Sequence, residues 1–185
     1  MRLWRVAAST RTYAADDITR NKRRAAPSVS PPLGGRTTYV VGLGALSGSG
    51  ASVRPGRWND HGQKVVYCAQ TPSLAVLETA AHVDSGGLPL NRFLVAIEVP
   101  DDVWARRDHL DLATLDPSWS AIPAGLASVQ AGAKWLVSMR TALLLVPSVI
   151  VHEESAVLIN PAHADAAGIT ARVVRKFEYD LLFRR

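Results

Sequence analysis

The sequence lacks the features that mark secreted and membrane proteins. Its 185 residues include a single cysteine, Cys68, so no internal disulfide can form, which favours a reducing compartment. No apolar run reaches the roughly 18–20 residues that a membrane span needs. The first residues, Met1–Val6, carry two arginines and no apolar signal segment, which argues against secretion. We therefore expect a cytoplasmic protein with no membrane association.

Motifs for metal, nucleotide-loop and serine-hydrolase chemistry are also missing. The five histidines lack metal-ligand spacing, so we expect no metal site. The Gly42–Gly48 stretch has Ser47 where a dinucleotide-binding turn needs its third glycine, and no phosphate-loop lysine follows. Ser148 lacks the flanking glycines of a nucleophile elbow. Its hydroxyl is therefore expected to make a polar contact rather than attack a substrate.

The positive charge is confined to one end of the chain. The net charge is +5, but residues 1–36 hold eight Lys or Arg and two acids, whereas residues 37–185 hold 13 basic and 14 acidic side chains. A nearly neutral body argues against direct nucleic-acid binding. A binding module that uses the basic cluster at 20–24 remains as an alternative.

The order of the predicted elements indicates one α+β domain over residues 1–185. Residues 18–45 are basic and rich in proline and glycine without periodicity, which indicates a loop insertion. Strands are predicted at 3–7, 65–70, 92–99, 143–151 with a break at Pro147–Ser148, 156–159 and 169–177. Helices are predicted at 72–82 and 124–140, with a turn at 116–120. Strands and helices do not alternate regularly, which excludes a doubly wound sheet.

One carboxylate stands out on the helix predicted at 72–82. Thr71 suits the N-cap and Pro72 the first helical position. Glu78 follows Leu74 by four residues and precedes Ala81 by three, so it shares the helix face that these residues form. We expect this face to pack inward, where a carboxylate needs a partner or a purpose.

A glycine-led turn and a short apolar strand precede this helix. They carry Arg57, Trp58 and Tyr67. Taken singly, an arginine pairs with a carboxylate, a tryptophan fills a core niche, and a helix glutamate is partly exposed. Together with Glu78 they favour a binding site for an anionic and aromatic ligand.

The combination of motifs resembles the RES-domain family, toxins of bacterial toxin–antitoxin pairs. The order and approximate spacing of several motifs agree with that family over nearly the whole chain except 18–45. The motifs stand at Leu3–Val6, Leu46–Ala51, Gly56–Asn59, Val65–Tyr67, Leu77–Glu78, Leu145–Ser148 and Leu158–His163. Two departures are the insertion itself, which the family usually lacks, and Pro55, which stands where a glycine is usual.

The resemblance implies a fold, a reaction and a partner. The fold is an ADP-ribosyltransferase-like split central β-sheet with flanking helices. The activity is degradation of NAD by cleavage of the nicotinamide–ribose bond, as a glycohydrolase or phosphorylase, or alternatively ADP-ribosyl transfer to a protein. NAD is the substrate, and no other cofactor is implied. The partner is an Xre-type helix-turn-helix antitoxin, which implies a hetero-oligomer.

The same resemblance suggests roles for particular residues. Glu78, Arg57, Tyr67 and Ser148 are the candidate catalytic residues. Arg5, Arg57, Trp58 and Tyr67 are the candidates for binding NAD. Glu78 would stabilise the ribose cation. Arg57, with Arg5 as a second candidate, would donate to the pyrophosphate or to ribose oxygens, and Tyr67 would stack on, or hydrogen-bond beside, the nicotinamide ribose. The sequence leaves open whether water, phosphate or a protein accepts the ADP-ribose.

Overall fold

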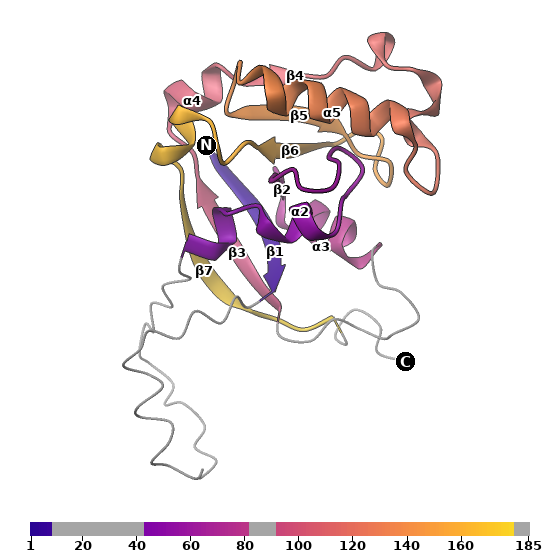
Figure 1. The fold of residues 1–185 in the computed structure, drawn as a ribbon. Coiled ribbons are helices and arrows are strands. Elements are labelled where there is room, and N and C mark those ends of the chain that lie inside the picture. The colour runs from indigo at the N-terminus through magenta and orange to yellow at the C-terminus, as the bar shows by residue number, and fades with distance from the viewer. Residues whose placement is uncertain (9–42, 82–91, 180–185) are drawn as a thin grey trace, which may run out of the picture.

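The structure is a computed structural model and describes residues 1–8, 43–81 and 92–179. Its centre is a mixed sheet of seven strands in the order β4-β5-β6-β2-β1-β3-β7 (Figure 1). The strands are β1 (Arg2–Ala8), β2 (Val66–Ala69), β3 (Arg92–Glu98), β4 (Asp108–His109), β5 (Leu143–Pro147), β6 (Ser155–Ile159) and β7 (Thr170–Phe177). All neighbouring strands are antiparallel except β4 and β5. The predicted α+β class is confirmed.

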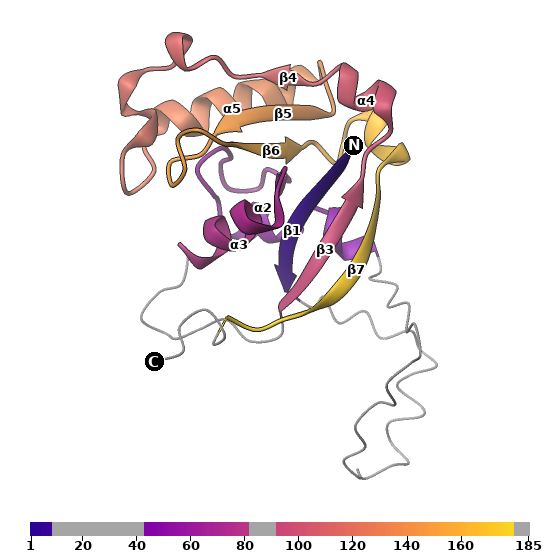
Figure 2. The same ribbon diagram turned by 180° about the vertical axis from the view of Figure 1, so that it is seen from behind.

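The sheet is almost divided between β1 and β2. Seven residue pairs join β1 to β3 and four join β2 to β6, but a single pair, Trp4 with Ala69, joins β1 to β2. In Figures 1 and 2 the strands β1, β3 and β7 run steeply, while β5 and β6 lie across them. This arrangement agrees with the predicted split sheet, and the split places Tyr67 of β2 beside the junction.

Short helices and one longer helix cover the two faces of the sheet. The α-helices are α2 (Ser49–Val53), α3 (Pro72–Ala80), α4 (Asp101–Ala105) and α5 (Leu126–Ser138). The 3₁₀ turns are η1 (Leu43–Leu46), η2 (Leu112–Thr114), η3 (Pro117–Ser120) and η4 (Ala164–Gly168). The Thr71 hydroxyl accepts a hydrogen bond from the Leu74 N–H at 3.1 Å, so the predicted N-cap of α3 is confirmed.

Alternating strand residues build two cores. On one face Leu143, Leu145 and Val157 belong to the largest cluster, which includes residues from η1 and α4. On the other face Leu144, Val146 and Leu158 pack against Trp135 and Leu136 of α5. The second face also receives α3, through Leu74 and Ala75 against Ala69. Helices α3 and α5 therefore cover the same face, and the candidate residues are carried by α3 and by segments next to it.

Most predicted elements form, with small differences at their ends. The interrupted strand is the main exception: β5 ends at Pro147, and residues 149–151 form bends that lead into a turn at 152–153 instead of resuming the strand. The Ser148 N–H donates to the Glu154 carbonyl at 3.1 Å. This hydrogen bond closes the loop between β5 and β6 and does not extend the pairing of the two strands. The predicted insertion at 18–45 lies outside the described residues except for 43–45, which belong to η1. His82, the predicted end of α3, is also outside them.

Candidate functional site

Glu78 and Ser148 form the first element of the site. Leu74 and Ala75 anchor α3 to the sheet, and Glu78 lies one turn further on, half-buried. The Ser148 hydroxyl, directly after β5, donates a hydrogen bond to Glu78 Oε1 at 2.7 Å. The two residues are 70 positions apart in the sequence, so only the packing of α3 on the sheet brings them together. Ala81, predicted on the same inward face, is exposed.

The direction of the Ser148 proton is fixed by its surroundings. A serine hydroxyl has one proton to donate and two lone pairs to accept with. The backbone N–H groups of Ile150 and Val151 both donate to Ser148 Oγ at 3.1 Å. Because both acceptor positions are filled, the single proton is left for Glu78. Ser148 is 1% exposed, so water does not compete for this contact.

Tyr67 interacts electrostatically with the charged candidates Arg57, Arg5 and Glu78. Its hydroxyl donates to Asn59 Oδ1 at 2.7 Å and accepts from the Trp58 N–H at 3.0 Å. Burial raises the pKa of Tyr67 well above its usual value, and Glu78 adds to the rise, whereas Trp58, Arg57 and Arg5 oppose it. The phenol therefore stays neutral, and its electrostatic neighbours are three of the predicted residues.

Arg57 is held by the backbone opposite. Its Nη1 donates to the carbonyls of Trp119 at 2.6 Å and Ala121 at 2.9 Å. Partial burial lowers the pKa of Arg57, while Glu78 and Tyr67 act in the opposite direction. The guanidinium is still charged at neutral pH. It therefore brings a fixed positive charge within electrostatic range of Glu78.

Arg5 reaches the site from the other side of the sheet junction. Its Nη1 donates to the Tyr67 carbonyl at 3.0 Å, so its side chain bridges β1 and β2 next to their single backbone pair. Burial is the main cause that lowers the pKa of Arg5. Its Nε atom is buried and has no hydrogen-bond partner within the described residues. An NAD-binding role for Arg5 remains a prediction, to which the structure adds a bridging role.

Trp58 packs into the core next to the candidate site. Its side chain is 3% exposed and stacks on Trp119, with ring centroids 6.0 Å apart and an interplanar angle of 22°. A Cβ at Gly132 of α5 would lie 1.9 Å from the Trp58 carbonyl oxygen, so α5 is packed directly on this backbone. An NAD-binding role for Trp58 stays a prediction, to which the structure adds that its side chain belongs to the core cluster of Trp135 and Leu144.

Asn59 is the residue that the sequence reasoning missed. It belongs to the Gly56–Asn59 motif but was assigned no role, because asparagine after a turn is usually exposed. In the structure it is 0% exposed and bonds to Tyr67. The available signal was its place directly after Arg57 and Trp58.

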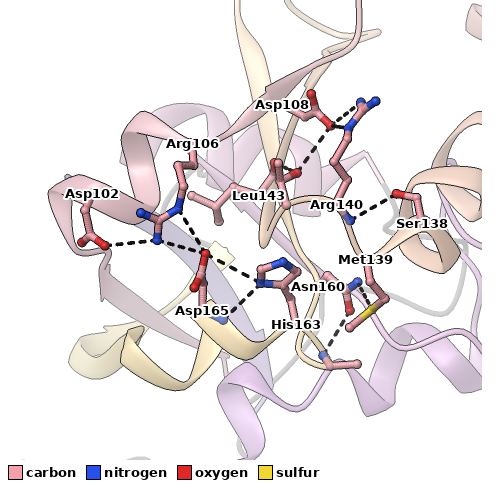
Figure 3. Close-up of polar contacts among 12 residues, drawn as sticks. Asp102, Arg106, Asp108, Ser138, Met139, Arg140, Leu143, Asn160, His163 and Asp165 are labelled. Carbon is pink, nitrogen blue, oxygen red and sulfur yellow. Dashed lines mark hydrogen bonds and ion pairs between the residues drawn. The ribbon is translucent and has the colours of Figure 1, made fainter.

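A second group of polar residues lies at the edge of the sheet (Figure 3). Arg106 of the α4 C-cap pairs with Asp102 at 3.1 Å and with Asp165 at 3.0 Å, and Arg140 pairs with Asp108. Asn160 donates to the Leu136 carbonyl at 3.1 Å. We call this set, completed by His163, the edge network. Its arginines and Asp102 are more than half exposed, whereas the Asp165 and Asp108 side chains are 33% and 23% exposed.

Neither a metal cluster nor a membrane helix is found in the described parts of the chain. Residues 1–8, 43–81 and 92–179 contain no group of three or more His, Cys, Asp or Glu side chains that could hold a metal ion. Over the same ranges no helix is long and apolar enough to cross a membrane.

Comparison with known proteins identifies the class to which this α+β domain belongs. A model of the family described as "RES domain" matches residues 2–181. The chain belongs to the RES domain family.

Named relatives give the family a more specific context. The chain is 49% identical over 177 residues to a Sphingobium sp. protein named "Prs ADP-ribosylating toxin", covering 96% of this chain and 92% of that protein. It is 36% identical over 130 residues to "Toxin Res" of Photorhabdus laumondii, covering 70% and 80%. It is 35% identical over 117 residues to "Toxin Res" of Yersinia enterocolitica, covering 63% and 75%. The predicted family is confirmed, and the relatives' names agree with the prediction of an ADP-ribosyltransferase-like toxin enzyme.

Proposed function

We propose that the protein cleaves the nicotinamide–ribose bond of NAD and transfers the ADP-ribose to a protein. The observation that carries this proposal is the Glu78–Ser148 pair, in which a carboxylate is held by a buried hydroxyl with one possible proton direction. The name of the Sphingobium relative supports a protein acceptor and gives Prs as the first acceptor to test.

The chemistry of the bond explains why a carboxylate is needed. Nicotinamide is cationic within NAD and leaves as a neutral molecule, so it requires no proton from the enzyme. The ribose left behind develops positive charge, which a fixed carboxylate stabilises. In the proposal Glu78 faces this charge, and Ser148 keeps its carboxylate from turning away. Chemistry of this kind requires no metal and no cofactor beyond NAD.

Arg57 supplies the anion-binding charge in the proposal. A guanidinium has five N–H donors, and the backbone carbonyls of Trp119 and Ala121 are bonded to Nη1 alone. We assign the remaining donors on Nε and Nη2 to the NAD pyrophosphate, because this fork suits paired phosphate oxygens. The electrostatic coupling of Arg57 to Glu78 supports a shared site.

Degradation of NAD with water or phosphate as the acceptor is the second candidate. It uses the same bond cleavage, and the residues that stabilise the ribose cation do not themselves select the acceptor. The "Toxin Res" relatives support the toxin role without naming an acceptor.

The proposal includes an antitoxin. A toxin that consumes cytoplasmic NAD or modifies an essential protein requires a neutralising partner, and the family resemblance points to an Xre-type helix-turn-helix protein. Expression of the chain alone is expected to arrest growth, and co-expression of such a partner to relieve it. Arrest that the Glu78→Gln variant causes equally would contradict an enzymatic toxin.

The test uses NAD labelled in both halves. Purified protein is incubated with Prs, with phosphate, or with neither, and free nicotinamide and protein-bound ADP-ribose are counted. Label on Prs supports transfer, and nicotinamide release without protein label supports degradation. Glu78→Gln is expected to lower either activity at least about 10²-fold. Absence of nicotinamide release under all conditions would overturn both candidates.

A further inference from the structure

We infer that Asn59 is a positioning residue that holds Tyr67 and the Arg57 turn in the geometry that binds NAD. The inference rests on the proposed use of NAD and extends it to a residue outside the predicted site. Asn59 is not expected to touch the substrate. It acts through Tyr67 and Arg57, which contact NAD in the proposal.

Every polar atom of the Asn59 side chain is engaged within the protein. Its Oδ1 accepts from the Tyr67 hydroxyl at 2.7 Å and from the Gly56 N–H at 2.9 Å. Its Nδ2 contacts three backbone carbonyls, those of Ala51 at 3.0 Å, Asp60 at 3.0 Å and Gln63 at 3.2 Å. A fully buried amide needs such partners. Through these five hydrogen bonds, the Asn59 side chain connects α2, two turns and β2.

The hydrogen bonds to Tyr67 define what that residue can offer a ligand. The phenol proton points to Asn59, and the Trp58 N–H donates to the phenol oxygen. The hydroxyl is thereby committed to the protein, and the part of Tyr67 left for NAD is the ring. Of the two roles that the sequence left open, stacking is the one that this geometry favours.

Arg57 is held from both sides by the same arrangement. The Gly56 N–H bonds to Asn59, and the Trp58 N–H bonds to Tyr67. The backbone of Arg57 thus lies between two anchored neighbours. Position 56 also needs a glycine, because a Cβ there would lie 2.7 Å from the Tyr67 hydroxyl oxygen. Removing Asn59 would loosen the ring and the guanidinium together.

Asn59 should affect NAD binding rather than the cleavage step. None of the hydrogen bonds of Asn59 involves Glu78 or Ser148. Loss of Asn59 should therefore weaken NAD binding more than it slows cleavage of bound NAD. A purely structural role would instead reduce the amount of active protein and leave the KM for NAD unchanged.

The first test separates these outcomes by kinetics of nicotinamide release. For Asn59→Ala we expect KM for NAD to rise about tenfold, as the loss of buried hydrogen bonds implies, with kcat changing about threefold or less. Asn160→Ala is the matched control, since Asn160 is equally buried, at 2% exposed, but belongs to the edge network. It should lose stability without a change in KM. Equal KM values for both variants would overturn the inference.

Tyr67→Phe keeps the experiment decisive if Asn59→Ala does not fold. This variant retains the bonds of Asn59 to Gly56 and to the three carbonyls, and it removes the Tyr67 hydroxyl that joins Asn59 to the Trp58 N–H. NAD binding is measured by calorimetry in the Glu78→Gln background, where turnover is suppressed. We expect Tyr67→Phe to raise Kd about tenfold. An unchanged Kd would mean that the hydroxyl link has no positioning role.

A third readout needs no NAD, so it distinguishes failure of the inference from failure of the proposed function. Hydrogen exchange of the Trp58 amide should be faster in Asn59→Ala than in the wild type and unchanged in Asn160→Ala. Tyr67→Phe, which removes the acceptor of this N–H, is the positive control. If the wild type releases no nicotinamide but these exchange rates change, the proposed function fails and the positioning geometry stands. If exchange is unchanged, the positioning geometry is wrong.

Discussion

The site and the edge network use similar residue types in different ways. The site joins Glu78 to Ser148 and Tyr67 to Asn59 through single short hydrogen bonds, and both Ser148 and Asn59 are buried. The edge network instead relies on ion pairs such as Arg106 with Asp102, whose side chains are 53% and 67% exposed (Figure 3). The edge network has more ion pairs, but the site has the more constrained geometry.

The difference follows from solvent. An exposed ion pair gains little, because water and salt screen it and two long side chains must be ordered. A buried polar group needs a hydrogen-bond partner. Removing one partner therefore leaves the other buried without a hydrogen bond, at the full free-energy cost of its desolvation. Constrained, buried polar geometry is what a reaction centre requires. Variants in the two regions should therefore differ sharply.

Ser148→Ala should have the largest effect among variants other than Glu78. It removes the donor that holds Glu78, and a hydrogen bond to a charged group implies a loss of at least about tenfold in nicotinamide release. It also leaves the N–H groups of Ile150 and Val151 without their acceptor, so the free energy of unfolding should fall by about 1–3 kcal/mol. Enzyme assays and urea denaturation measure the two effects.

Ser138→Ala is the control for that variant. Ser138 is exposed at the end of α5 and donates only to the nearby Trp135 carbonyl, at 2.8 Å. Nicotinamide release by Ser138→Ala should equal that of the wild type. A Ser148→Ala variant with wild-type activity would show that Glu78 does not depend on its serine partner.

Gly56→Ala should have an intermediate effect. The added Cβ would lie 2.7 Å from the Tyr67 hydroxyl oxygen and 2.8 Å from its ring, which Asn59 holds in place. Overpacking of this kind lowers stability by about 1–3 kcal/mol, and the displaced ring should raise the KM for NAD. Gly50→Ala is the matched control, because nothing lies within 4 Å of its Cβ. Equal denaturation midpoints for the two variants would contradict the close packing around Tyr67.

Arg106→Ala should have the smallest effect. It removes the ion pairs that the α4 C-cap makes to Asp102 of α4 and Asp165 of η4. We expect no measurable change in the urea midpoint or in nicotinamide release, at low salt or high salt. A loss of activity would mean that the edge network supports the site and that the contrast between the two regions is wrong.

Local sequence signals were sufficient for most of the fold. The N-cap at Thr71 and the alternating strand at 92–99 depend on neighbouring residues, and both form. The strand predicted through 151 was wrong. The apolar run 149–151 resembles a strand, but its conformation depends on a contact with residues far away in the sequence. Val151 packs beside α3 in the cluster of Leu74, which no local rule predicts.

The site was less accessible from local patterns. The residue types at Glu78, Arg57 and Tyr67 could be singled out, whereas Ser148 became a candidate only through the family resemblance. Its contact with Glu78 spans 70 positions and was not predicted. The stacking of Trp58 on Trp119, 61 positions away, was likewise not predicted from its motif. The role of Asn59 was missed although its five partners all lie within eight residues of it, because asparagine next to a turn is usually exposed and no local rule indicates that its amide is buried.

The central claim is that Glu78, held by Ser148, stabilises the ribose cation as NAD is cleaved. Nicotinamide release by the wild type, by Glu78→Gln and by Glu98→Gln tests it most directly, since Glu98 is an exposed carboxylate paired with Arg2. We predict release by the wild type and by Glu98→Gln at similar rates, and at least about 10²-fold less by Glu78→Gln. Equal release by Glu78→Gln and the wild type would contradict the account.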